Sequence, residues 1–284
     1  MHIYMRFPGG LSKALTLSYD DGVEQDKRLI KIMKAHGLKG TFNLNSGLFA
    51  PEGKVYPEGD VHRRMSASEA LALYSDSGIE VAVHAYTHRF LEKLAPAQIA
   101  YEVIKDRECL ESMFGKIVRG MAYPFGTYDS DVVEVLRNCG IAYSRTTKRT
   151  GKFSLPEEPL LLDPTCHHRD PELMTLLDKF INLKTRYHVS VFYLWGHSYE
   201  FESDNNWEVI EKFAEKAGGR DDVWYATNIE IIDYRKAFDS LVMSADSGIV
   251  HNPTSTTVFF DVAGSKNGRD GSYSIAPGET LVLR

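Results

Sequence analysis

The chain has 284 residues, of which 43% are hydrophobic and 25% charged, and its formal net charge is −6. This composition is typical of a globular protein with a sizeable core, and the acidic balance argues against nucleic acid as a partner, because phosphate binding needs a basic face. Three cysteines are too few to predict a disulfide framework. The first residues have no apolar core of the signal-peptide kind and no long apolar run follows, so we expect a cytoplasmic protein with no membrane partner.

Short apolar segments alternate with amphipathic segments over the first 240 residues. Strands are predicted at 15–19, 41–44, 79–83, 118–123, 141–144, 160–162, 189–195 and 223–226. Helices are predicted at 24–36, 67–77, 96–114, 128–138, 171–187, 207–217 and 229–238, and Ser66 with Glu69 predicts a capping box before the second of them. Repeated βα units with apolar strands favour a parallel α/β barrel of about seven strands, spanning residues 1–240.

The pattern changes in residues 241–284. Apolar and polar residues alternate there, and turn sequences such as Asn252-Pro253 and Pro277-Gly278 separate the runs. This pattern predicts a small antiparallel β appendage at the C-terminus. We expect it to cap the barrel, because about 44 residues form only a weak core of their own. Carbohydrate binding and support of a homo-oligomer are the alternatives.

Polar residues follow four of the predicted strands, at the rim where βα barrels build active sites. Asp20 and Asp21 are adjacent at the end of the first strand, where two carboxylates are costly unless a positive charge holds them. His84 and His88 follow the third strand, and two histidines four apart on one helical turn can bind one metal ion. A helix N-cap with a turn, and a structural histidine, are the alternative interpretations.

The other two motifs carry groups suited to proton transfer and to binding of an oxyanion. Tyr123-Pro124-Phe125-Gly126 predicts a tight turn that can direct a backbone N–H inward, although an ordinary strand-to-helix loop has the same pattern. Trp195-Gly196-His197 ends a very apolar strand, and a histidine there can serve as general acid or base. Trp195 suits either the core or a surface on which a sugar stacks.

One aspartate and two histidines leave positions on a metal ion open for water and substrate. This layout is that of a catalytic site rather than of a closed structural site. Asp21, His84 and His88 are therefore predicted to hold one divalent ion. Zinc is the default for this donor set, with cobalt, nickel and manganese as alternatives.

Taken in order, the four motifs resemble those of the polysaccharide deacetylases, which are carbohydrate esterase family 4 or the NodB homology domain. The resemblance covers about residues 14–235 and implies a distorted (β/α) barrel. It also implies that water activated by the metal attacks an acetyl group. The matching positions are Asp20 as catalytic base, Asp21, His84 and His88 as metal ligands, Phe125 as donor of a backbone N–H to the oxyanion, and His197 as general acid.

Three departures from the family pattern indicate a divergent branch. The family carries an arginine shortly before the proline of the third motif, where it holds the base, and the nearest arginine here is Arg119. Ala85 stands where a hydroxyl residue usually follows the first histidine. The aspartate that orients the acid histidine has two candidates, Asp163 and Asp170.

The resemblance implies an acetylated oligosaccharide or a small N-acyl compound as substrate. Residues predicted to contact it are Asn45, Tyr123, Pro124, Trp195 and His167. A cyclic amide, imide or allantoin-type amidohydrolase would use the same metal, base and acid with a different pocket. A non-catalytic carbohydrate-binding protein is the third alternative, although such a protein would have no need of the complete set of five catalytic and ligand side chains.

Overall fold

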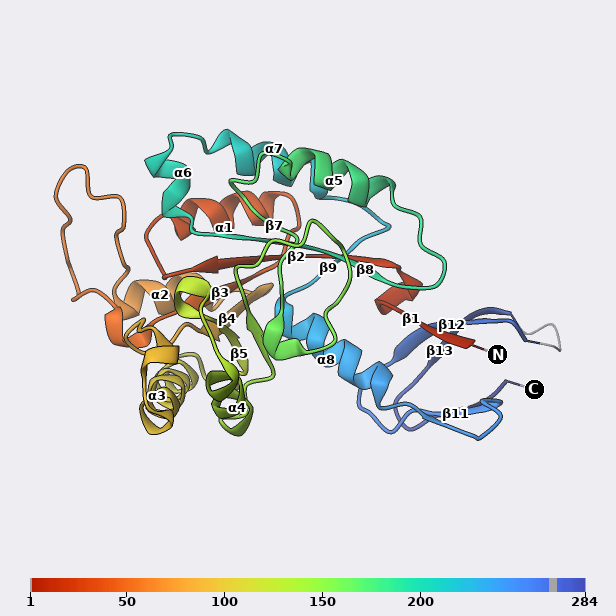
Figure 1. The fold of residues 1–284 in the computed structure, drawn as a ribbon. Helices are drawn as coiled ribbons and strands as arrows, with labels where there is room; N and C mark the ends of the chain where they lie inside the picture. The colour runs from red at the N-terminus through yellow and green to blue at the C-terminus, as the bar shows by residue number, and fades with distance from the viewer. Residues whose placement is uncertain (1, 266–269, 284) are drawn as a thin grey trace.

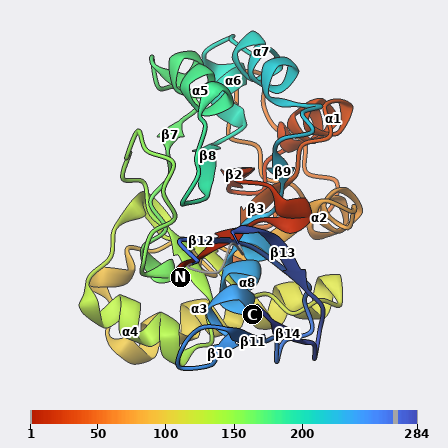
Figure 2. The same ribbon diagram turned by 90° about the vertical axis from the view of Figure 1, so that its right-hand side faces the viewer.

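The computed structural model describes residues 2–265 and 270–283. Its centre is a curled parallel sheet with helices packed against its outer face (Figures 1 and 2). In spatial order the strands are β6 (Tyr143–Arg145), β5 (Gly120–Ala122), β4 (Ile79–Val83), β3 (Gly40–Leu44), β2 (Lys13–Asp20), β8 (Ser190–Gly196) and β7 (Cys166–His167). The predicted distorted barrel of about seven strands is confirmed.

The barrel is closed by irregular backbone rather than by a full strand. Leu162 forms a parallel bridge with Arg145 of β6, and Cys166 pairs with Leu194 of β8 only four residues later. Residues 162–166 therefore cross the gap between the two edge strands of the sheet. A short strand, β9 (Trp224–Tyr225), pairs with the start of β2, where β3 has not yet begun.

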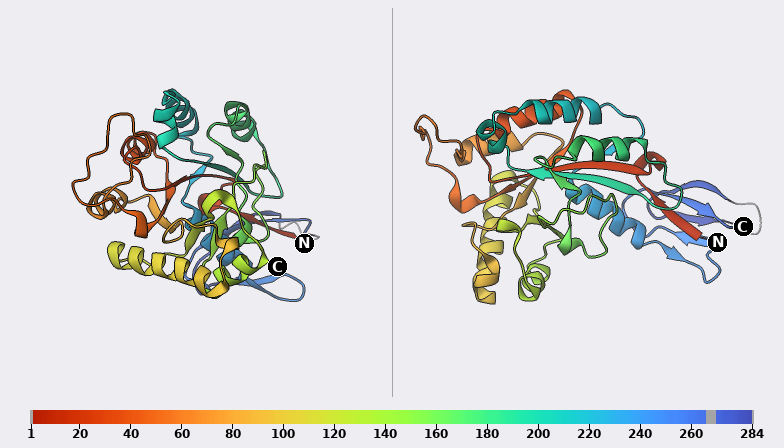
Figure 3. Two further views of the ribbon diagram at one scale, coloured as in Figure 1. Left: turned by 60° about the vertical axis from the view of Figure 1, so that its left-hand side comes forward. Right: turned by 45° about the horizontal axis from the view of Figure 1, so that its top comes forward.

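Helices cover the outside of the barrel (Figures 1 and 3). They are α1 (Asp26–Ala35), α2 (Ala67–Tyr74), α3 (Pro96–Phe114), α4 (Ser130–Asn138), α5 (Leu173–Asn182), α6 (Tyr199–Ser203) and α7 (Glu208–Ala217). Helix α8 (Asn228–Asp239) packs instead against inner-face residues such as Val191 and Tyr193. The predicted capping box of Ser66 and Glu69 is confirmed. The helix predicted at 171–187 is shorter, because Leu183 is extended and ends α5. Among the described residues, no helix has both the length and the apolar character needed to cross a membrane.

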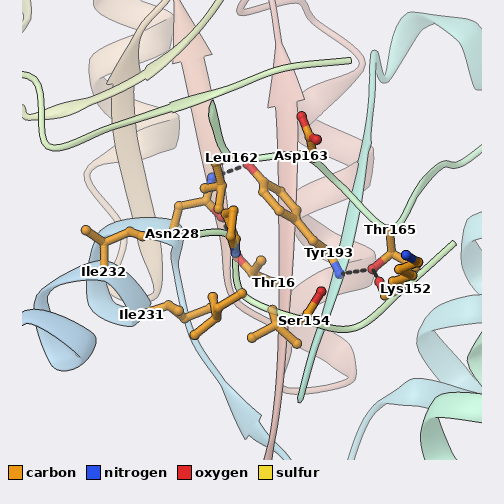
Figure 4. Close-up of a pocket in the computed structure, with 13 residues that line it drawn as sticks. Thr16, Lys152, Ser154, Leu162, Asp163, Thr165, Tyr193, Asn228, Ile231 and Ile232 are labelled. Atoms are coloured by element: carbon orange, nitrogen blue, oxygen red, sulfur yellow. Dashed lines mark hydrogen bonds between the residues drawn. The ribbon is translucent and has the colours of Figure 1, made fainter. Parts of the chain in front are cut away.

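The strands bury a polar face as well as an apolar one. Leu15, Leu17 and Tyr19 of β2 belong to the core shared with the helices, whereas the alternate residue Thr16 is hydrogen-bonded inside the barrel. Asn228, the first residue of α8, accepts from the Thr16 hydroxyl at 2.9 Å and donates to the Tyr193 hydroxyl at 2.6 Å. Figure 4 shows these side chains around a small cavity on the inner side of β2 and β8.

Glu80 of β4 extends this polar interior. Its carboxylate accepts from the hydroxyls of Thr41 at 2.8 Å and Tyr143 at 2.7 Å, and from the Ile229 amide in the first turn of α8 at 2.9 Å. The apolar residues of β2 that alternate with Thr16 thus mark its outer face, while the polar side chains of the inner face are satisfied by hydrogen bonds to one another.

Two small antiparallel sheets lie beyond the barrel. One has the order β1 (His2–Arg6), β12 (Val258–Ala263), β13 (Gly271–Ile275), and the other β10 (Val242–Met243), β11 (Ile249–His251), β14 (Thr280–Val282). The predicted antiparallel structure is confirmed, and the N-terminal strand joins it. The Tyr234 hydroxyl joins α8 to the first of these sheets. It donates to the Arg6 carbonyl of β1 at 2.7 Å and accepts from the Phe259 amide of β12 at 2.9 Å.

Replacing Glu80 tests the polar interior. Burial raises the pKa of Glu80 from 4.5 to about 7, so the folded protein keeps a proton that the unfolded chain loses. This group therefore costs stability as the pH rises from about 4.5 to 7, and the cost is about 3 kcal/mol above that range. In urea unfolding at pH 5 and pH 8, Glu80→Gln should gain about this much relative to wild type at the higher pH. Exposed Glu58→Gln should give no such gain, and an equal response of both variants would contradict the assignment.

Candidate active site

Asp20 ends β2 as a buried carboxylate with a fixed set of donors. The Asn43 amide donates to its Oδ1 at 2.8 Å, and the Arg145 guanidinium donates to its Oδ2. Burial alone would raise the pKa of Asp20, but the charges of Arg145, His84 and His197 outweigh it and lower the pKa below its usual value. Asp20 is therefore an ionised, immobile acceptor at neutral pH.

Arg145 supplies the positive charge that the sequence left unassigned. It ends β6, is fully buried, and its guanidinium lies over the Trp195 ring at 4.3 Å. Arg119, the nearest arginine in the sequence, pairs instead with Asp233 at 2.6 Å on the outside. Trp195 is buried between Arg145 and the His167 ring, whose centroid lies 4.5 Å away, so it serves as packing around the site.

Asp21 is held by residues of the loop that precedes α2. His62 Nε2 lies 3.1 Å from its Oδ2, and Arg64 Nη2 lies 3.0 Å from its Oδ1. The hydrogen bond from His62 and the charges of His84 and Arg64 outweigh burial and lower the pKa of Asp21. His62 and Arg64 could not be identified from a sequence motif, because the path of an irregular loop decides that they lie beside Asp21.

His84 directly follows β4 and His88 ends the turn after it, and both face Asp21. One ligand atom from each of the three residues lies within 4.8 Å of the others. His84 Nδ1 lies 2.8 Å from the Ala122 carbonyl, which requires a proton on Nδ1 and leaves Nε2 free as an acceptor. Burial lowers the pKa of His84 to about 4 and also lowers that of His88. Both rings are therefore neutral near pH 7, as a metal ligand must be.

The segment from His84 to His88 is a turn and not the helical turn expected from the spacing. Ala85 and His88 have φ angles of 61° and 52°, which interrupt any helix. Carboxylates of α3 hold this turn: Asp106 accepts from the His84 amide at 3.1 Å, and Glu102 from the Thr87 amide at 2.7 Å. Asn45, predicted to contact substrate, is buried and donates to the Ala85 carbonyl at 2.8 Å.

The turn Pro124–Gly126 brings Phe125 beside the histidines. Phe125 has φ of 59°, is half exposed, and its ring lies 4.5 Å from His88 and 3.8 Å from the parallel ring of Phe90. The Gly126 amide donates to the Tyr123 carbonyl at 2.9 Å and closes the turn. The Phe125 amide takes no part in this hydrogen bond. Pro124 and Tyr123 are buried, and the Tyr123 hydroxyl donates to the Leu160 carbonyl at 2.9 Å.

His197 follows β8 and lies between two carboxylates. Its Nε2 is 3.8 Å from Asp20 Oδ2, and its Nδ1 is 3.6 Å from Glu200 Oε2 in α6. Burial lowers its pKa, but the carboxylates of Glu200, Asp20 and Asp21 outweigh burial and raise it above the usual value. Glu200 was not identified from the sequence, since it lies three residues after His197 on an acidic helix that also suits a solvated surface.

The two aspartates proposed to orient His197 have other partners. Asp163 accepts from the Thr146 hydroxyl at 2.5 Å and lines the cavity of Figure 4. Asp170 pairs with Arg149. The carboxylate on the Nδ1 side of His197 is that of Glu200, which also has His167 Nε2 at 3.1 Å.

The matched family accords with this geometry. Residues 9–144 match the model of the polysaccharide deacetylase family, which supports the resemblance of the first three motifs to this family. An uncharacterized protein of Streptomyces coelicolor is 28% identical over 125 residues, which are 44% of this chain and 44% of the relative. The chain therefore spans less than half the length of that relative.

One solved structure has a similar fold over most of its length. A protein of Mycobacterium smegmatis assigned to the polysaccharide deacetylases superposes with a TM-score of 0.57 at 15% identity, covering 83% of this chain and 94% of that chain. A family 4 carbohydrate esterase of Streptomyces lividans gives a TM-score of 0.48 at 16% identity, covering 72% and 88%. The first of these supports the barrel fold and its extent along the chain.

A double-mutant cycle tests whether Arg145 is needed for the charge of Asp20. Arg145→Met leaves a buried carboxylate without its cation, so we expect a loss of about 3–5 kcal/mol in unfolding free energy. Removing both charges with Asp20→Asn should recover part of that loss. Arg119→Met breaks an exposed pair and should cost below about 1 kcal/mol. Urea unfolding of the metal-free protein gives the unfolding free energy of the two single variants, of their combination and of Arg119→Met. If the losses of the Asp20 and Arg145 variants were strictly additive, the pairing would be refuted.

Proposed function

We propose that the protein is a metal-dependent hydrolase that removes acetyl groups from N-acetylated or O-acetylated carbohydrate. The observation that supports this most directly is the convergence of Asp21, His84 and His88 beside a buried carboxylate and a histidine of raised pKa. A binding protein without catalysis gives no reason for an ionised base and a proton donor to lie 3.8 Å apart across the same rim.

Asp21, His84 and His88 would hold a divalent ion of the zinc class. A carboxylate oxygen and two neutral imidazole nitrogens are the donor set that such ions prefer, and three protein ligands leave room for substrate. The free Nε2 of His84 fits this role. When bound, the ion supplies positive charge that polarises the acetyl carbonyl and lowers the pKa of water.

The chain's own residues would divide the proton transfers. Asp20 is ionised and fixed by Asn43 and Arg145, so it can take a proton from the attacking water. The Phe125 amide can donate to the oxyanion that develops as the water adds. His197 can then protonate the leaving amine or alcohol, because its raised pKa keeps the ring protonated at higher pH than usual.

The surface beside His88 suits a sugar ring. Phe90 and Phe125 are 37% and 50% exposed and stack with an interplanar angle of 10°, which makes a partly exposed apolar face at the edge of the site, with the Lys93 ammonium 4.1 Å from the Phe90 centroid. Such a face can pack against the C–H groups of a pyranose ring, while the polar rim takes its hydroxyls. Trp195 is covered by Arg145 and His167, so Phe90 and Phe125 are better placed than Trp195 to contact a sugar ring.

Acetate release tests the proposed activity. Zinc- or cobalt-loaded protein should release acetate from N-acetylated amino-sugar oligomers or from O-acetylated xylo-oligomers. Asp20→Asn should lower kcat by about 100-fold or more, because it removes the base without removing a metal ligand. Asp170→Asn, the same change at a carboxylate paired with Arg149, should retain the wild-type rate.

The pattern of failure separates the alternatives. Release that persists in Asp20→Asn would refute the role of Asp20. No release by protein that contains metal would overturn the deacetylase proposal, and hydrolysis of a cyclic amide or imide would replace it. Removal of the ion by a chelator should abolish activity, and zinc or cobalt should restore it.

A further inference from the structure

His62 lies in the loop before α2 and contacts a proposed metal ligand from outside the ligand group. Its Nε2 is 3.1 Å from Asp21 Oδ2. His62 does not belong to the group of three ligand atoms at Asp21 that lie within 4.8 Å of one another. The contact therefore lies around the proposed metal site, and no step of the proposed reaction uses it.

The chemistry of a ligating carboxylate decides which partner donates in this contact. A carboxylate that binds a metal ion is ionised, and its two oxygens are then acceptors only. The hydrogen bond must therefore run from the Nε2–H of His62 to Asp21 Oδ2. A nitrogen that carries this proton has no lone pair for an ion, so His62 acts on the site through Asp21 and not as a further ligand.

The two oxygens of Asp21 face different neighbours. Oδ1 lies 3.8 Å from His88 Nε2, on the side of the proposed ion, whereas Oδ2 faces His62. Arg64 Nη2 donates to Oδ1 at 3.0 Å, and Arg64 Nη1 donates to the Asp21 carbonyl at 2.7 Å. Because a carboxylate oxygen has two lone pairs, Arg64 leaves one of those on Oδ1 for an ion. Rotation of the carboxylate would break the hydrogen bonds of both oxygens, so His62 and Arg64 together fix its orientation.

Contacts with α6 and α1 hold the His62 ring in place. The ring packs edge-on against that of Tyr199 in α6, with the centroids 4.9 Å apart and an interplanar angle of 79°. The next residue, Arg63, pairs with Glu202 of α6 at 2.7 Å and with Glu24 before α1 at 2.8 Å. These contacts direct Nε2 of His62 at Asp21, although 40% of the His62 side chain is exposed.

We propose that His62 is a positioning residue of the metal site, which holds Asp21 Oδ2 and so leaves Oδ1 for the ion. Hydrogen bonds from outside the ligand group orient ligating carboxylates, and their loss lowers metal affinity by about 10–100-fold. Asp21 has φ of 81°, so its backbone is strained and its side chain depends on such contacts. The inference rests on the proposed binding of a divalent ion at Asp21, and it adds a residue that none of the four motifs contains.

The zinc affinity of the full chain tests this role. Chelator-stripped protein is titrated with zinc in competition with a chromophoric chelator of known affinity, which gives the Kd for zinc of wild type and of each variant. His62→Leu should weaken zinc binding by about 10–100-fold. His62→Gln keeps an N–H donor at the position of Nε2 and should recover most of that loss. His188→Leu, the same change at an exposed histidine outside the site, should bind zinc as wild type does.

The outcomes separate this inference from the proposed function. Wild-type affinity in His62→Leu would overturn the role of His62 and leave the ion at Asp21 in place. Equal losses in His62→Leu and His62→Gln, in variants that far-UV circular dichroism shows to be folded, would also overturn it, because the hydrogen bond would not be the cause. No zinc binding by wild type would overturn both the ion at Asp21 and the role of His62.

Discussion

The burial of two adjacent carboxylates at the end of β2 is the constraint around which the barrel rim is organised. Asp20 and Asp21 are 2% and 7% exposed, and each would cost several kcal/mol if left without a partner. Their compensation comes from three separate segments: Asn43 on β3, Arg145 on β6, and the loop before α2. The closed barrel is what brings these segments to one point, so the fold and the charge of the site depend on each other.

The same rim stores backbone strain at its functional positions. Asp21, Ala85, His88 and Phe125 all have φ between 52° and 81°, a region that non-glycine residues seldom occupy. Each such residue costs on the order of 1 kcal/mol or more, and the surrounding contacts must hold it there. The α3 carboxylates hold the turn of Ala85 and His88, the ring of Phe90 packs against Phe125, and Arg64 holds Asp21. Contacts within the protein therefore fix the shape of the site, which is the condition for electrostatic catalysis.

The alternation of strands and helices, and the polar residues at the carboxyl ends of the strands, could be predicted, because parallel strands bring those ends to one edge. The sequence therefore predicted that Asp20, Asp21, His84, His88 and His197 lie together at the rim, and the structure places them there. His62, Arg64 and Glu200 could not be found in this way, since a loop path and a short helix decide where they lie. The polar interior of the barrel was not predicted either. The apolar residues of β2 and β8 dominate the hydropathy of these strands, and the hydrogen bonds of Thr16 and Tyr193 on the inner face leave no mark in the sequence pattern.

The arginine that the motif lacks shows why position in space matters more than position in sequence. The family that the chain resembles carries its arginine shortly before the proline of the third motif, here Pro124. Ala122 lies in that stretch, and the register of β5 and β6 pairs Ala122 directly with Arg145. A guanidinium one strand over and at the same height along the barrel reaches the same carboxylate, since neighbouring strands are about 5 Å apart. Moving the cation to β6 also places it against Trp195 and next to the Leu162 bridge. The residue that holds the base thereby also lies where the irregular backbone closes the barrel.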